Sequence, residues 1–181
     1  MMLLGINMAM AQVNFTQTTT SDFMQGTGLN VNIADDCVSL QSKMQSLSDW
    51  NATTNLPQTL KNHQVVTWHN YVYLIGGYNG SNEVSTVYRA TQESTGISGW
   101  TTLNALPVAL KDMAVVATQT HLYVIGGRNS DEVSDKIYAA ELSSTGAITE
   151  WETMDITLPH PCWGGRAIMT MGNIYLIGGA T

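Results

Sequence analysis

Charged residues are scarce in this sequence, and cations are the scarcest of them. The 181 residues include 7 Lys and Arg against 14 Asp and Glu, which makes 12% charged residues and a formal net charge of -7. An ordinary soluble domain carries about 25% charged residues. So few cations leave no basic stripe for a phosphate backbone, which argues against a nucleic-acid partner. Hydrophobic residues make up 44%, enough for a folded core, and this excludes intrinsic disorder.

Long apolar runs and cysteines are also in short supply. No run approaches the ~18–20 residues of a membrane-spanning helix, so we predict no transmembrane segment. The two cysteines, Cys37 and Cys162, lie far apart and form no metal-ligand motif. Each is compatible with a buried thiol, and whether the two pair is left open. A low charge combined with many Thr, Ser, Asn and Gly residues is typical of extracytoplasmic β proteins.

The N-terminal residues carry a second indication of export. Residues 1–11 (MMLLGINMAMA) are apolar and end in Ala9-Met10-Ala11, a small-x-small pattern that suits signal peptidase. This segment lacks a cationic n-region and is shorter than a usual leader, so a plain apolar N-terminus is the alternative. We interpret residues 1–11 as a signal-peptide remnant and expect a secreted, periplasmic or cell-surface protein.

A repeat with a period near 50 residues is the strongest signal in the chain. Tryptophans recur at intervals of 50 and 51, and Leu-Pro pairs and Gly-Gly doublets recur at intervals of 50 and 52. Each Gly-Gly doublet follows an apolar run, YVYLI, HLYVI or NIYLI. The recurring residues are Trp50, Trp100 and Trp151, Leu56-Pro57, Leu106-Pro107 and Leu158-Pro159, Gly76-Gly77, Gly126-Gly127 and Gly178-Gly179, and Tyr88 and Tyr138.

Each unit is predicted to hold four short strands. The strands expected in the first two units are 64–68, 71–75, 85–91 and 97–103, then 114–118, 122–125, 136–142 and 148–153. Turn signals separate them, and no segment has a sustained helical period. Four antiparallel strands in about 50 residues form a propeller blade, so we predict an all-β, partial β-propeller of about three to four four-stranded blades. The Trp is expected on the outer strand, wedged between adjacent blades.

The apolar run, the Gly-Gly doublet, the later Tyr and the Trp together resemble kelch repeats of the bacterial exported type. The resemblance covers residues 45–181, as units 45–95, 96–145 and 146–181, the last of them short. Tyr88 and Trp100 lie 12 residues apart, and Tyr138 and Trp151 lie 13 apart, whereas kelch units commonly place the pair about seven apart. The extra residues lengthen the predicted hairpin between the third and fourth strands.

The residues before the repeats form a separate region. Residues 12–44 are predicted to be a β-hairpin or linker, or part of a preceding blade, because Leu29, Val31 and Ile33 alternate with polar residues. Three units are fewer than the four to eight blades that close a propeller. We therefore expect a fragment of a longer propeller, with the remaining blades supplied by further chain, and self-association of the fragment in isolation.

The loops after the second and fourth strands of a blade lie at the same end, so we expect them to form one rim. The segment 160–166 differs most from its counterparts and marks this rim as a candidate ligand-binding face, with a variable, solvated rim as the alternative. His63 is expected to brace the rim structurally, through a hydrogen bond. The candidate binding residues are Asn62, His63, Tyr78, Asn79, Asp112, Arg128, Asn129, Trp163 and Arg166, beside Lys61 and Lys111.

No catalytic motif accompanies the repeat, so we predict no catalytic residue, no metal site and no cofactor. The favoured hypothesis is a non-catalytic module that binds a protein or carbohydrate ligand through its loop face. The alternative, which the resemblance implies, is a fragment of a propeller enzyme of the galactose oxidase or sialic-acid epimerase type. The copper enzyme would need a Tyr–Cys crosslink and two His ligands. Cys162 is the one residue that suggests such a crosslink, and no pair of His residues in this sequence matches the two ligands.

Overall fold

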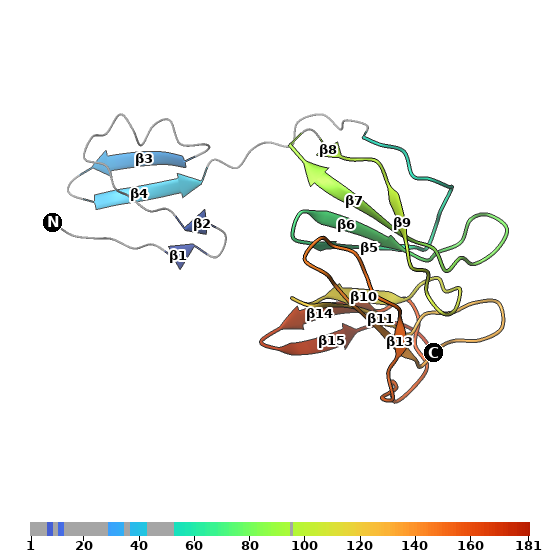
Figure 1. Ribbon diagram of the computed structural model, residues 1–181. Coiled ribbons are helices and arrows are strands. Elements are labelled where there is room, and N and C mark those ends of the chain that lie inside the picture. The colour runs from blue at the N-terminus through green and yellow to red at the C-terminus, as the bar shows by residue number, and fades with distance from the viewer. Residues whose placement is uncertain (1–6, 9–10, 13–28, 35–36, 43–52, 95) are drawn as a thin grey trace. The chain divides into compact units, whose positions relative to one another are not determined.

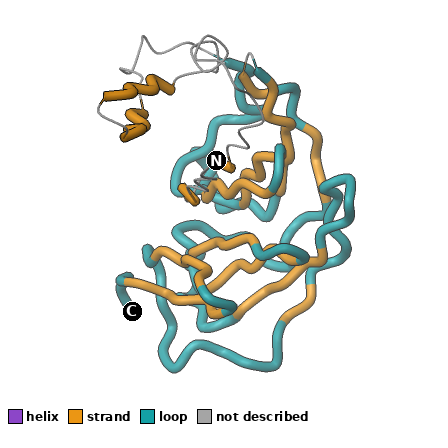
Figure 2. The backbone as a smooth tube through the Cα atoms, turned by 90° about the vertical axis from the view of Figure 1, so that its left-hand side faces the viewer, coloured by secondary structure: helices purple, strands orange, loops and turns teal. Residues whose placement is uncertain are grey.

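A computed structural model describes residues 7–8, 11–12, 29–34, 37–42, 53–94 and 96–181, and every regular element in them is a β-strand (Figure 1). The chain divides into two compact units, Met1–Asn51 and Ala52–Thr181. Figure 2 shows the described parts of both units as strands and loops only. The described residues accordingly include no helix long and apolar enough to cross a membrane.

The described residues of the first unit form two short antiparallel pairs. Strand β1 (Asn7–Met8) pairs with β2 (Ala11–Gln12), and β3 (Leu29–Ala34) pairs with β4 (Cys37–Ser42). The β3–β4 register matches Leu29 to Ser42 and Ala34 to Cys37, so the alternating segment around Val31 forms a hairpin. Most of the predicted leader, as well as Trp50, lies outside the described residues, and the proposed division at residues 11 and 44 stays a prediction.

Blade 1 is an antiparallel meander. Strands β5 (Gln64–Trp68), β6 (Tyr71–Ile75), β7 (Val87–Glu93) and β9 (Thr101–Leu103) pair in chain order, and β8 (Gly96–Ile97) pairs with the end of β7.

Blade 2 repeats the meander, and blade 3 is described as two strands. Blade 2 consists of β10 (Ala114–Ala117), β11 (His121–Ile125), β12 (Ile137–Glu141) and β13 (Glu152–Thr153). Blade 3 consists of β14 (Arg166–Thr170) paired with β15 (Asn173–Ile177).

The fourth strand is shorter than predicted in both complete blades, for one physical reason. In blade 1 the hydroxyl of Ser98 accepts a hydrogen bond from the Thr91 N–H at 2.8 Å, between β8 and β9. In blade 2 the hydroxyl of Thr149 accepts from the Glu141 N–H at 3.0 Å. A side-chain oxygen thus takes the place of a backbone carbonyl and interrupts the strand ladder. The Trp of each unit consequently precedes the last strand by one residue instead of lying on it.

The core lies between the blades. One buried cluster joins Tyr73 and Ile75 of blade 1 to Leu110 and Met113 of the segment that enters blade 2. A second cluster packs Ile125 and its neighbours on blade 2 against side chains of blade 3. Trp151 packs against the first cluster, and its indole N–H donates to the Asn104 carbonyl at 3.0 Å. Trp151 therefore connects blade 2 to the chain that leaves blade 1.

The Gly-Gly doublets are the points where consecutive blades touch. Gly77 N–H donates to the Leu110 carbonyl, and Gly127 N–H donates to the Cys162 carbonyl, both at 2.8 Å. The same carbonyls abut the first glycine of each doublet: a Cβ on Gly76 would lie 2.5 Å from Leu110 O, and one on Gly126 would meet Cys162 O. Both first glycines also have positive φ, +57° and +61°, which L side chains adopt at a cost. Glycine is therefore required at Gly76 and Gly126, because a Cβ would clash with the carbonyl and because φ is positive.

Replacing Gly126 by Ala should cost substantially more stability than replacing Gly172. Gly172 has a similar φ of +76° but has no atom within 4 Å of its Cβ position, so Gly172→Ala reports backbone strain alone, about 1–2 kcal/mol. Gly126→Ala adds the displacement of the Cys162 carbonyl, and we expect at least about 2 kcal/mol of further loss. Urea unfolding monitored by circular dichroism measures both. Equal losses would contradict the inter-blade contact.

Candidate functional site

The loops that follow the second strands and the segments that precede the first strands lie side by side, as the meander requires. Within the three blades, backbone bridges join Lys61 to Tyr78, Lys111 to Arg128, and Trp163 to Ala180. These bridges extend each inner hairpin beyond its strands and carry the candidate residues to one end of the blades. We call this end the rim.

A chain of backbone hydrogen bonds runs along the rim from blade to blade. Asp112 N–H donates to the Asn62 carbonyl at 3.0 Å, and Gly164 N–H donates to the Asp112 carbonyl at 2.7 Å. All three residues have positive φ, 58°, 56° and 75°. Asn, Asp and Gly are the residues that tolerate this conformation best. Three such residues at intervals of 50 and 52 are the sequence signal that predicts this chain of hydrogen bonds.

Polar and aromatic side chains from all three blades meet around Asp112. Its carboxylate accepts from the Asn62 amide at 2.5 Å and from Arg128 Nε at 2.8 Å. The Arg128 guanidinium carbon in turn lies 3.8 Å from the centroid of the Trp163 ring. Charge-assisted hydrogen bonding and cation–π stacking together fix the plane of the guanidinium. Four predicted site residues thus form one contiguous cluster.

Tyr78 forms a second cluster between blades 1 and 2. The ammonium groups of Lys61 and Lys111 lie 5.0 and 5.1 Å from its ring centroid. Lys111 also donates to the Glu83 carboxylate at 2.6 Å, and this hydrogen bond, followed by one from the backbone N–H of Glu83, holds the pKa of Glu83 below its usual range. The Tyr78 hydroxyl donates to the Ser81 carbonyl at 3.1 Å, which orients the ring.

The two clusters are variants of one inter-blade contact. Tyr78 and Arg128 occupy equivalent loop positions, and Lys111 and Trp163 occupy equivalent entry positions in the following blades. Between blades 1 and 2 the loop supplies the aromatic ring and the entry segment supplies the cation. Between blades 2 and 3 these roles are exchanged. The divergence of segment 160–166 therefore preserves a cation–π pair while reversing its direction.

Three predicted residues are engaged locally. Asn79 Oδ1 accepts from the backbone N–H groups of Ser81 and Asn82, and Asn129 Oδ1 does the same for Asp131 and Glu132, each at 2.9 Å. Such bonds stabilise a turn and engage the amide oxygen. Arg166 begins β14 and donates to the carbonyl of the preceding Gly165 at 3.0 Å, apart from the two clusters.

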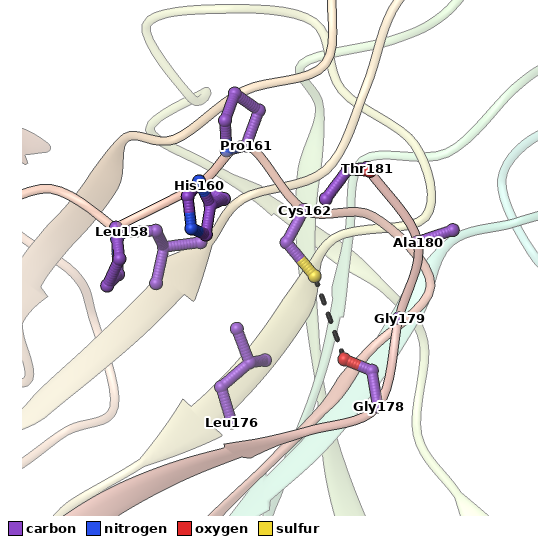
Figure 3. Close-up of a pocket in the computed structure, with 10 residues that line it drawn as sticks. Leu158, His160, Pro161, Cys162, Leu176, Gly178, Gly179, Ala180 and Thr181 are labelled. Carbon is purple, nitrogen blue, oxygen red and sulfur yellow. Dashed lines mark hydrogen bonds between the residues drawn. The ribbon is translucent and has the colours of Figure 1, made fainter.

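A cavity of about 250 Å³ lies beside Cys162, between the segment that enters blade 3 and the residues that follow β15 (Figure 3). It is lined by Leu158, His160 and Leu176 among others, and the thiol donates to the Gly178 carbonyl at 3.7 Å. Within the described residues, no three His, Cys, Asp or Glu side chains gather as a metal site would require. The cavity is a mainly apolar hollow at the margin of the rim.

His63 lies at the rim immediately before β5, and the structural hydrogen bond predicted for this residue is not made at its Nδ1. That atom is buried with no partner among the described residues. Burial lowers the pKa of His63 below its ordinary value of 6.5 because the imidazolium loses solvation. The unfolded chain then binds the proton more tightly than the folded chain does. The free energy of unfolding is therefore at its full value above pH 6.5. It decreases as the pH falls from 6.5 to the pKa of His63 in the folded chain.

Substituting His63 by Met should flatten this pH dependence. Met is the residue that blade 2 carries at the equivalent position, Met113, where it is fully buried. We expect the free energy of unfolding of the wild-type chain to decrease more between pH 7.5 and pH 5 than that of His63→Met, because only the wild type has this proton to take up. Parallel urea titrations at both pH values measure the difference. Identical changes in the two proteins would be inconsistent with a depressed pKa.

The Kelch motif matches residues 59–89, which span β5, β6, the first Gly-Gly doublet and Tyr88. Among solved structures, the chain is similar to YjhT, a kelch-type propeller, with a TM-score of 0.55 and 20% identity over 66% of this chain and 34% of that one. The chain thus spans about a third of the length of YjhT. No curated protein sequence matches.

The motif match, the four-stranded meanders and the likeness to YjhT agree on one assignment. The predictions of kelch repeats and of a partial, all-β propeller are therefore confirmed. Residues 59–89 carry a Kelch motif, and the blades of this chain have a partial β-propeller fold of the kelch type.

Proposed function

We propose that this chain is a non-catalytic module that binds a protein or a carbohydrate through its rim. The observation that carries the proposal is the alignment of Tyr78 and Trp163 at successive blade junctions, each stacked with cations. Aromatic faces flanked by oriented polar groups suit both sugar rings and peptide loops.

The rim side chains are held in place before any ligand arrives. The Arg128 guanidinium is fixed by both Asp112 and Trp163, and the Lys111 ammonium is fixed by Glu83 and the Tyr78 ring. Binding to such a surface loses less side-chain entropy than binding to mobile groups. Tyr, Trp and Arg are also the residues that contribute most to binding energy at protein interfaces.

The enzyme alternative has no observation in its favour comparable with this one. Cys162, the residue that prompted it, lies in the apolar cavity with its thiol directed to the Gly178 carbonyl. We further propose that the ligand is met outside the cytoplasm, because the apolar Ala9-Met10-Ala11 leader pattern and the low surface charge suit an exported protein.

Substitutions at the two aromatic rim residues should weaken ligand binding at least tenfold. We expect the full chain to bind members of an immobilised glycan or peptide array, and both Tyr78→Ala and Trp163→Ala to lose that signal because each removes a stacking surface. Biolayer interferometry with the best array probe gives the affinities, and circular dichroism checks that each variant is folded.

The matched control for these variants is Gln119→Ala. Gln119 is an exposed residue in the turn between β10 and β11, at the end of blade 2 opposite the rim. Only its carbonyl makes a described contact, with the Trp68 indole, and the substitution keeps that carbonyl. We expect wild-type binding by this variant. An array without any signal, or equal affinities for all four proteins, would count against recognition at the rim.

A further inference from the structure

The loop after the second strand of blade 1 contains the one Asn-Gly pair of the sequence, Asn79-Gly80. Both residues lie in the turn that a backbone bridge between Tyr78 and Glu83 closes. Gly80 is exposed, and its N–H donates to no described residue. No atom lies within 4 Å of the position that a Cβ on Gly80 would occupy. The Gly80 nitrogen is therefore unhindered and free to react with the side chain that precedes it.

The Asn79 side chain is held in an arrangement that favours such a reaction. Its Oδ1 accepts from the backbone N–H groups of Ser81 and Asn82, each at 2.9 Å, and these bonds fold the side chain over the Gly80 peptide. The two donors withdraw electron density from Cγ. They also stabilise the negative charge that develops on Oδ1 when a nucleophile attacks Cγ, as donors do in an oxyanion hole.

We propose that Asn79-Gly80 is a site of spontaneous modification, with water as the only co-reactant. Hydroxide from the solvent takes the Gly80 amide proton, and the nitrogen attacks Cγ of Asn79. The N–Cγ bond forms, the Cγ–Nδ2 bond breaks, and Nδ2 leaves as ammonia with a proton from water, which regenerates the hydroxide. The cyclic imide then adds water at one of its two carbonyl carbons. It opens to an aspartate or an isoaspartate at position 79, so the whole reaction consumes one water and releases one ammonia.

The modification would change the rim in both charge and backbone geometry. Either product places a carboxylate in the residue after Tyr78, whose ring centroid lies 5.0 and 5.1 Å from the ammonium groups of Lys61 and Lys111. The isoaspartate also lengthens the main chain by one methylene group and thereby disrupts the turn. This chemistry goes beyond the binding role proposed for the rim and does not depend on it.

Blade 2 carries a matched turn without the glycine. The Oδ1 of Asn129 accepts from two backbone N–H groups at 2.9 Å, the distance found at Asn79. In both turns the Asn N–H donates to the carbonyl three residues later, at 3.0 Å. Ser130 stands in place of Gly80, and its Cβ hinders the approach of the side chain to the Ser130 nitrogen. Asn129 is thus an internal control that differs in the residue supplying the nucleophile.

Incubation of the full chain in native buffer at pH 8 should convert Asn79 at least about tenfold faster than Asn129, because only the nitrogen that follows Asn79 is unhindered. Peptide mass spectrometry measures the gain of about 1 Da at each position. Labelling by an isoaspartyl methyltransferase identifies the isoaspartate. The rate at Asn79 should increase with pH, because hydroxide generates the nucleophile, and circular dichroism checks that the chain stays folded.

Exchanging the residue after each asparagine completes the test. Ser130→Gly should create a second reactive position, with Asn129 converting at a rate close to that of Asn79. Gly80→Ser should slow the conversion of Asn79 at least about tenfold, to the rate of Asn129. The proposal is overturned if Asn79 converts no faster than Asn129 in the folded wild type. It is equally overturned if Asn129 stays unreactive in the folded Ser130→Gly variant.

Discussion

The contact between a backbone carbonyl and a glycine doublet is the constraint on which the rest of the structure depends. The carbonyls of Leu110 and Cys162 each accept from the second glycine of the preceding blade and lie against the first. Because no Cβ fits between them, the doublet sets how closely the entry segment approaches. That approach brings the apolar faces of adjacent blades within packing distance, and the buried clusters follow from it.

The rim follows from the same constraint. Two residues after each of these carbonyls, Asp112 and Gly164 donate their N–H groups to the preceding blade. The residue between them, Lys111 or Trp163, is thus flanked on both sides by backbone hydrogen bonds to the preceding blade. Its side chain therefore lies against the loop of that blade. The cation–π pairs therefore arise from backbone geometry, which explains why the pair persists when the aromatic residue and the cation exchange places.

Periodicity in the sequence was sufficient to predict the strands, the doublets and the blade architecture, because each of these depends on residue type at a fixed interval. The direction of loop side chains does not depend on interval alone. Asn79 and Asn129 appeared suited to a ligand, yet their amide oxygens bind their own turns. The hydroxyls of Ser98 and Thr149 shortened the predicted last strands, since a strand pattern does not show which oxygen completes a ladder. Segment 160–166 likewise appeared to break the symmetry, because a compensating exchange at Arg128 is recognisable only once the pairing across blades is known.

The distribution of charge at the rim bears on the kind of ligand it suits. In a chain with only 7 cationic residues, Lys61, Lys111 and Arg128 lie within two adjoining clusters. Two of these cations are already paired with carboxylates, Lys111 with Glu83 and Arg128 with Asp112. The pairing cancels much of the net field while leaving the hydrogen-bonding groups and ring faces oriented. A surface of this kind discriminates by the geometry of polar groups more than by charge, which supports the proposal of sugar hydroxyls or peptide amides, and not a polyanion, as the ligand.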